Sequence, residues 1–145
     1  MRDRPIYSAL ILAGAMPFVA CALLPVAGVD SLGRLGPLHD LAAVYGLAIL
    51  CFITGIHLAT QLYSPNALPL NLFVGSNVVF LAVFFAFAAS SLKWALATQL
   101  LAFPLLLAVD YQLLHKGLIN RHYLGMRFAA TALACGSIVF ILISG

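Results

Sequence analysis

Five long apolar stretches constrain how this chain can fold. Each holds about 20 mostly apolar residues, the length that an α-helix needs to cross the hydrocarbon core of a bilayer. Only 8% of the 145 residues are charged, whereas a soluble domain has about a quarter of its residues charged. Water cannot solvate a surface so poor in charge. The sequence therefore predicts an all-α integral membrane bundle of five transmembrane helices in one domain, residues 1–145, with spans at approximately 6–26, 42–63, 70–92, 94–114 and 123–143.

Basic residues near the span ends predict the orientation, because cytoplasmic loops carry the excess of lysine and arginine. The N-terminus and the loops after the second and fourth spans share one side of the membrane. Five of the seven basic residues lie there: Arg2, Arg4, Lys116, Arg121 and Arg127. The opposite side has Arg34 and Lys93. We expect a cytoplasmic N-terminus and an external C-terminus. The scattered basic residues form no nucleic-acid-binding face, so the lipid bilayer is the expected partner.

The second span contains a histidine, His57, well inside its apolar run YGLAILCFITGIHLATQLY. Steps of four and three residues along this span place five side chains on one stripe: Gly46, Leu50, Thr54, His57 and Gln61. Residues at this spacing share one face of a helix. The stripe becomes polar toward the cytoplasmic end, so we expect it to face protein.

Counting depth at about 1.5 Å per residue places three more polar residues near the level of His57. These are Asn77, Asp110 and Arg127, from the third, fourth and fifth spans. An unpaired charge in hydrocarbon costs about 2.5–3.5 kcal/mol on insertion scales, so we expect an ion pair between Asp110 and Arg127. Two purely structural alternatives stay open. In the first, the cluster only holds the helices together. In the second, Arg127 extends to the lipid headgroups.

Other chemistry is poorly supported. Cys21, Cys51 and Cys135 lie inside apolar segments without a metal-binding or disulfide spacing, and no catalytic constellation is present. We therefore expect neither an enzyme nor a cofactor. Haem ligation by His57 with His115 or His122 stays a minor alternative, because axial histidines must face one cavity.

The first span has one rival interpretation. Two arginines, an apolar run and Phe-Val-Ala-Cys ending at Cys21 faintly resemble a lipoprotein signal. However, Phe18 occupies the position where leucine is typical, and the apolar run continues past Cys21. We expect the segment to be retained as a span.

Three sequence patches resemble a known family: LAGAMPF, YGLAILCFITGIHLA and VDYQLLHKGLINRHYLGMRFAATALA. This is a domain-of-unknown-function family of small proteobacterial inner-membrane proteins that includes mitochondrial transmembrane protein 69. The resemblance implies a bacterial inner membrane, or a mitochondrial one, but no activity. It points to Pro17, Tyr45, Gly46, Gly55, His57, Asp110, Arg127 and Thr131. In one departure, Leu58 stands where the family pattern has tryptophan.

Combining both lines of argument, the candidate ligand-binding or proton-relay residues are His57, Asn77, Asp110, Arg127, Thr54 and Tyr45. We consider three classes of function. The first is a non-catalytic accessory or assembly subunit of a membrane complex or homo-oligomer, which an exposed helix face with small residues would favour. The second is a small transporter or proton-coupled carrier, which a hydrated cavity ending at His57 would favour. The third is an intramembrane binder of haem, quinone or lipid, which a deep apolar pocket would favour.

Overall fold

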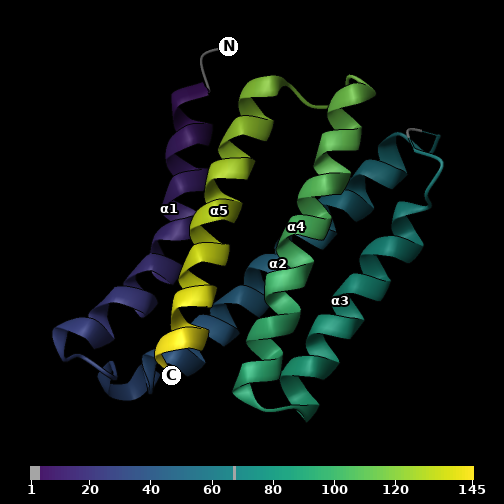
Figure 1. Ribbon diagram of the computed structural model, residues 1–145. Coiled ribbons are helices and arrows are strands. Elements are labelled where there is room, and N and C mark those ends of the chain that lie inside the picture. Colours follow the sequence, from purple (N-terminus) through teal and green to yellow (C-terminus); the bar gives the residue numbers. More distant parts are fainter. Residues whose placement is uncertain (1–3, 67) are drawn as a thin grey trace.

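The computed structural model describes residues 4–66 and 68–145, and it shows five long helices joined by short connections (Figure 1). These are α1 (Arg4–Leu23), α2 (Leu38–Tyr63), α3 (Leu72–Ala89), α4 (Leu92–His115) and α5 (Arg121–Ser144), with short 3₁₀ helices η1 (Leu24–Ala27) and η2 (Gly33–Leu35) after α1. Each long helix is long and apolar enough to cross a membrane. The predicted five-helix bundle is therefore confirmed.

Local chemistry explains where several helices begin and end. The amide N–H groups of Phe73 and Tyr123 each donate a hydrogen bond to an asparagine side chain, Asn71 at 2.9 Å and Asn120 at 2.7 Å. These caps satisfy donors that the first turns of α3 and α5 leave free. At the end of α1, Pro25 lies in the tighter η1 turn, since proline has no N–H to continue the α-helical ladder.

The helices pack in a definite order. α1 runs along α5, and α3 and α4 form an antiparallel hairpin joined by Ser90 and Ser91. α2 crosses the bundle diagonally (Figure 1). α1 also bends midway (Figure 1), and it contains a proline, Pro17, a residue that often bends helices. This bend and the diagonal course of α2 together shape the space between α1, α2 and α5.

The two described ends of the chain lie at opposite ends of the bundle, as an odd number of spans requires (Figure 1). The start of α1 lies at the same end as the α2–α3 and α4–α5 connections. This grouping matches the one on which the positive-inside argument rests. Arg2 lies outside the described residues, and the side of the membrane that this end occupies stays a prediction.

An aromatic cluster ties α1, α2 and α4 together. The Phe18 ring is almost fully buried and meets the rings of Tyr45 and Phe103 edge-on, at centroid distances of 5.1 and 5.6 Å. Such edge-to-face pairs stabilise a fold beyond the area they bury. The Tyr45 hydroxyl also donates a 2.7 Å hydrogen bond to the backbone oxygen of Gly14 on α1.

One polar contact fixes α2 against α4. The fully buried Gln99 donates from its Nε2 to the backbone oxygen of Ala43, at 2.7 Å. Its amide lies directly against Gly46, where a Cβ atom would overlap Gln99 Oε1. A side chain at position 46 would therefore displace the buried Gln99 amide, and the first position of the predicted stripe on α2 is buried at this contact.

Candidate functional site: a buried triad beside an apolar cavity

Three charged or ionisable side chains from three helices meet inside the bundle. His57 on α2 donates from Nε2 to Oδ1 of Asp110 on α4, at 2.9 Å, and Arg127 on α5 donates from Nε to Oδ2 of the same carboxylate, at 3.0 Å. The exposed fractions of these residues are 2% for His57, 3% for Asp110 and 9% for Arg127. Asp110 thus accepts on both oxygens, so its charge is paired and hydrogen-bonded as burial demands.

This geometry decides several of the sequence predictions. The predicted Asp110–Arg127 ion pair is confirmed, and the alternative in which Arg127 extends to the headgroups is wrong, because its side chain is 11% exposed and held by Asp110. The inward-facing stripe of α2 is confirmed at Gly46, Leu50, Thr54 and His57, which are all buried.

Three predicted candidates lie away from the triad. Asn77 is exposed, and its Nδ2 donates to the backbone oxygen of Phe73 on its own helix at 2.7 Å. Thr54 donates to the backbone oxygen of Cys51 at 3.0 Å. Tyr45 lies in the aromatic cluster with Phe18. Asn77 therefore faces away from the charged residues and makes no contact with them, and its position at their depth stays a prediction.

Thr54 and Asn77 instead line a small cavity between α2 and α3, with a volume of about 280 Å³. Leu58, which stands where the family pattern has tryptophan, lines the same cavity. The departure from the pattern thus falls on the opposite side of α2 from Ile53 and Ile56, which line a second and larger cavity.

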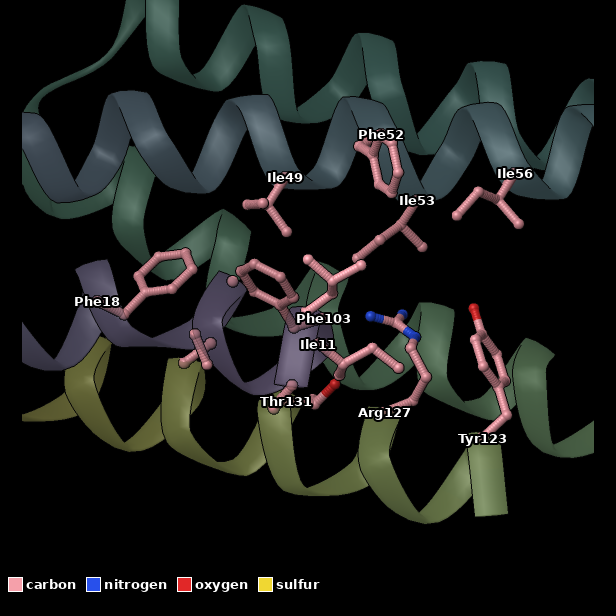
Figure 2. A pocket seen from close by; sticks show the side chains of 15 residues that line it. Ile11, Phe18, Ile49, Phe52, Ile53, Ile56, Phe103, Tyr123, Arg127 and Thr131 are labelled. Atoms are coloured by element: carbon pink, nitrogen blue, oxygen red, sulfur yellow. The ribbon is translucent and has the colours of Figure 1, made fainter. Parts of the chain in front are cut away.

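The larger cavity lies between α1, α2 and α5, with Phe103 of α4 at its inner wall, and has a volume of about 570 Å³ (Figure 2). Pockets for small organic ligands typically measure about 300–1,000 Å³. Only three of the 15 lining residues carry polar side-chain atoms, namely Tyr123, Arg127 and Thr131. The others are glycine, alanine, leucine, isoleucine and phenylalanine.

Arg127 connects the triad to this cavity. Arginine has five N–H donors, and among the described residues the guanidinium donates only the one hydrogen bond from Nε to Asp110. The terminal Nη2 is buried without a hydrogen-bond partner among them. In Figure 2 the guanidinium points into the space that the cavity side chains surround. The ion pair engages Nε of the guanidinium, and the buried Nη2 stays without a partner on a residue that lines the cavity.

Thr131, one turn after Arg127 on α5, also lines the cavity with a hydroxyl that is buried and unpaired. The chain has four threonines, all in its described part, and Thr54, Thr60 and Thr98 each donate to a backbone oxygen of the preceding turn. Thr131 does not. Buried polar groups without partners are rare in proteins, and each one requires an explanation.

The cavity opens toward the surface that faces lipid. Leu10 on α1 and Phe52 on α2 both line it and are 65% and 67% exposed, whereas Phe103 and Ala134 at its inner end are buried. α5 rises about 1.5 Å per residue, so Arg127 lies about 9 Å from the start of that helix. Exposed apolar side chains thus surround the mouth of the cavity, on a surface of the kind that faces lipid when such helices span a bilayer.

The remaining histidines do not join His57. His115 packs edge-on against Tyr111 at 4.6 Å, and Nε2 of His122 lies 2.8 Å from Ser8 Oγ. His57, His115 and His122 thus contact three different partners, Asp110, Tyr111 and Ser8, and haem ligation by two of them stays a minor alternative. Within the part of the chain that the structure describes, no group of three or more His, Cys, Asp or Glu residues is placed to hold a metal ion.

The fold and the site define a multi-pass membrane protein with a charged triad buried beside an apolar cavity. The chain belongs to the family described as "Protein of unknown function (DUF3429)", whose match covers residues 4–143. The resemblance to a domain-of-unknown-function family is therefore confirmed. No curated protein and no solved structure matches the chain.

Proposed function

We propose that this protein binds a lipid-soluble small molecule inside the membrane, in the cavity between α1, α2 and α5, and that it does so as a binder and not as an enzyme. One observation carries the proposal: Arg127 Nη2 and Thr131 Oγ1 are buried without partners on residues that line an otherwise apolar cavity. A ligand with a polar group and an apolar body would satisfy both atoms and fill the space.

Energetics support a ligand over simple helix packing. A buried donor or acceptor without a partner costs about 1–3 kcal/mol. Gln99 Oε1 is also unpaired but does not line the cavity, whereas Arg127 Nη2 and Thr131 Oγ1 belong to two residues of the same cavity wall. Valine has the shape of threonine without the hydroxyl and would serve packing equally well at Thr131. The polar groups at the cavity wall are better explained by an occupant that pairs with them.

The transporter class receives less support. Among the residues that line the larger cavity, no histidine or carboxylate is present. His57 donates to Asp110 and does not line this cavity. A proton-coupled carrier using His57 needs a hydrated route to that ring, and the apolar wall does not supply one.

Two matched glycine variants test the proposal. A Cβ atom at Gly14, which lines the cavity, meets nothing within 4 Å, so Gly14→Phe places a ring in the cavity without a clash at its base. Gly136 is exposed on α5 and equally unobstructed, so Gly136→Phe is the same change on the outer surface. Wild type and both variants are purified in mild detergent, and bound small molecules are quantified by mass spectrometry.

We expect a compound bound in near-stoichiometric amount to wild type and Gly136→Phe, and at least about tenfold depleted in Gly14→Phe, since a loss of 1.4 kcal/mol in affinity already corresponds to tenfold. Equal content in all three proteins, in the proportions of the bulk lipid extract, would overturn the proposal.

The same purified proteins also test whether this chain is an accessory subunit of a larger complex. The outer face of α5 carries Gly125, Ala132 and Gly136, all exposed, and small residues allow close helix approach in membranes. That face alone identifies no partner, so the accessory role stays a prediction. Stoichiometric partner subunits that are lost from Gly136→Phe, without a bound small molecule, would establish it in place of the binder.

A further inference from the structure

The charges around the cavity limit what kind of polar group its ligand can carry. Arg127 is the only charged residue among those that line the cavity. Its positive charge is already matched by the Asp110 carboxylate, whose Oδ2 lies 3.0 Å from Arg127 Nε. The described lining supplies no second cation to match an anionic ligand.

An anionic head group would therefore be poorly accommodated. A carboxylate or phosphate at Arg127 would share one guanidinium with Asp110, and like charges held close together in a low dielectric repel strongly. A buried charge without its own partner is strongly disfavoured. An uncharged oxygen acceptor can take the free N–H groups of Arg127 without adding charge to the site.

The unpaired groups specify an acceptor. Arginine only donates hydrogen bonds, and a threonine hydroxyl both donates and accepts. Arg127 and Thr131 lie one turn apart on α5 and both line the cavity. A carbonyl oxygen has two lone pairs, so it can accept from either group, and from both where small side-chain movements expose them to the cavity. Tyr123, on the other side of Arg127 (Figure 2), is a further polar group of the lining.

The rest of the cavity suits a flat ring with a hydrocarbon tail. The rings of Phe18, Phe52 and Phe103 line it, and the isoleucines of α2 line the side toward the exposed Phe52 (Figure 2). Aromatic side chains pack well against other rings in offset or edge-on arrangements. The exposed lining residues leave room for a tail to reach the bilayer.

Resting on the proposed function, we infer that the ligand is an uncharged lipid-soluble carbonyl compound of the quinone class. Its carbonyl oxygen accepts hydrogen bonds from Arg127 and Thr131, its ring packs among the phenylalanines, and its tail extends toward the lipid. The Asp110 carboxylate and His57 hold Arg127 in place and select against anions.

Three probes with the same decyl chain test this inference: a decyl-substituted benzoquinone, decylbenzene and decanoate at neutral pH. Binding of each to the purified full chain in detergent is measured by titration calorimetry, with Gly14→Phe as the blank for partition into the micelle. The same titrations are repeated with Thr131→Val, whose thermal unfolding is recorded to verify that it folds.

We expect the benzoquinone to bind at least about tenfold more tightly than decanoate, the equivalent of one 1.4 kcal/mol step. Thr131→Val should weaken the benzoquinone roughly three- to tenfold, the range for one hydrogen bond, and leave decylbenzene unchanged. Tighter binding of decanoate would overturn the charge argument while the cavity remained a ligand site. Equal binding of benzoquinone and decylbenzene, unaffected by Thr131→Val, would overturn the carbonyl assignment. If no probe binds wild type better than Gly14→Phe, the proposed function itself fails.

Discussion

The strongest energetic prediction concerns the pairing of Asp110 with Arg127. Replacing Asp110 by asparagine leaves a buried guanidinium without its counter-charge. Removing one partner of a buried ion pair costs about 3–5 kcal/mol. We expect a loss at or slightly below the lower end of that range. The Arg127 side chain keeps 11% exposure and lies only about 9 Å from the start of α5, so it can shift partly toward the membrane interface. We expect Asp110→Asn to destabilise the protein by about 2–3 kcal/mol.

A double-mutant cycle separates the pair from its surroundings. Arg127→Gln alone leaves Asp110 with His57 as its one remaining partner, and we expect a similar loss of about 2–3 kcal/mol. The double variant Asp110→Asn, Arg127→Gln contains two neutral amides that can bond to each other. It should lose no more than either single variant, which gives a coupling of about 2 kcal/mol, within the range for residues in direct contact.

The cycle is measured by reversible unfolding in mixed micelles with increasing SDS, with helix content followed by circular dichroism. A double variant as unstable as the sum of both single variants would refute the reasoning, because the two charges would then not stabilise each other. Lys93→Gln, which removes a charge at the exposed start of α4, is the control and should shift stability by less than about 0.5 kcal/mol.

Three further predictions use the same assay. Gly46→Ala should lower the free energy of unfolding by about 1–3 kcal/mol through overpacking, because the new Cβ atom overlaps Gln99 Oε1. Adding Gln99→Ala to the same chain should recover part of that loss. If the two losses simply add, the proposed contact is refuted. Thr131→Val should stabilise the ligand-free protein by about 1 kcal/mol, because it removes an unpaired buried hydroxyl; destabilisation would mean that the hydroxyl has a partner in the bundle. Tyr45→Phe should cost about 0.5–1.5 kcal/mol through the lost hydrogen bond to Gly14, and no change would show that this bond does not hold α1 on α2.

The charged triad could be predicted from the sequence because hydrophobic length fixes the spans and the rise per residue fixes depth. Two opposite charges at matching depth on helices joined by a short loop have a strong reason to pair. Asn77 shows the limit of that argument. The buried residues of α3 are Leu72, Ser76 and Val83, and Asn77 is a full residue step, about 100°, away from Ser76 around the helix. α3 is apolar on nearly all sides, so its sequence does not show which of the adjacent Ser76 and Asn77 faces the bundle.

The cavity could not be predicted in the same way. Its walls come from α1, which bends, from α2, which crosses the bundle diagonally, and from α5. Such crossing geometry follows from side-chain packing across helices and is not readable from the period of one helix. Gln99 is likewise a polar residue within the fourth apolar stretch, but its fit against Gly46 depends on how closely α2 and α4 approach.

Helix packing and ligand binding are not competing roles for this triad. A lock between helices needs only the two contacts of Asp110, to His57 and to Arg127 Nε. Such a lock does not require the unpaired Nη2 of Arg127 or the unpaired hydroxyl of Thr131, and both of these residues line the cavity. Fixing one edge of the guanidinium to a buried carboxylate limits its movement, so that the remaining donors are oriented before a ligand arrives, which reduces the entropic cost of binding. The same contacts that hold α2, α4 and α5 together thus prepare Arg127 for a ligand, and Asp110→Asn should weaken benzoquinone binding as well as the fold.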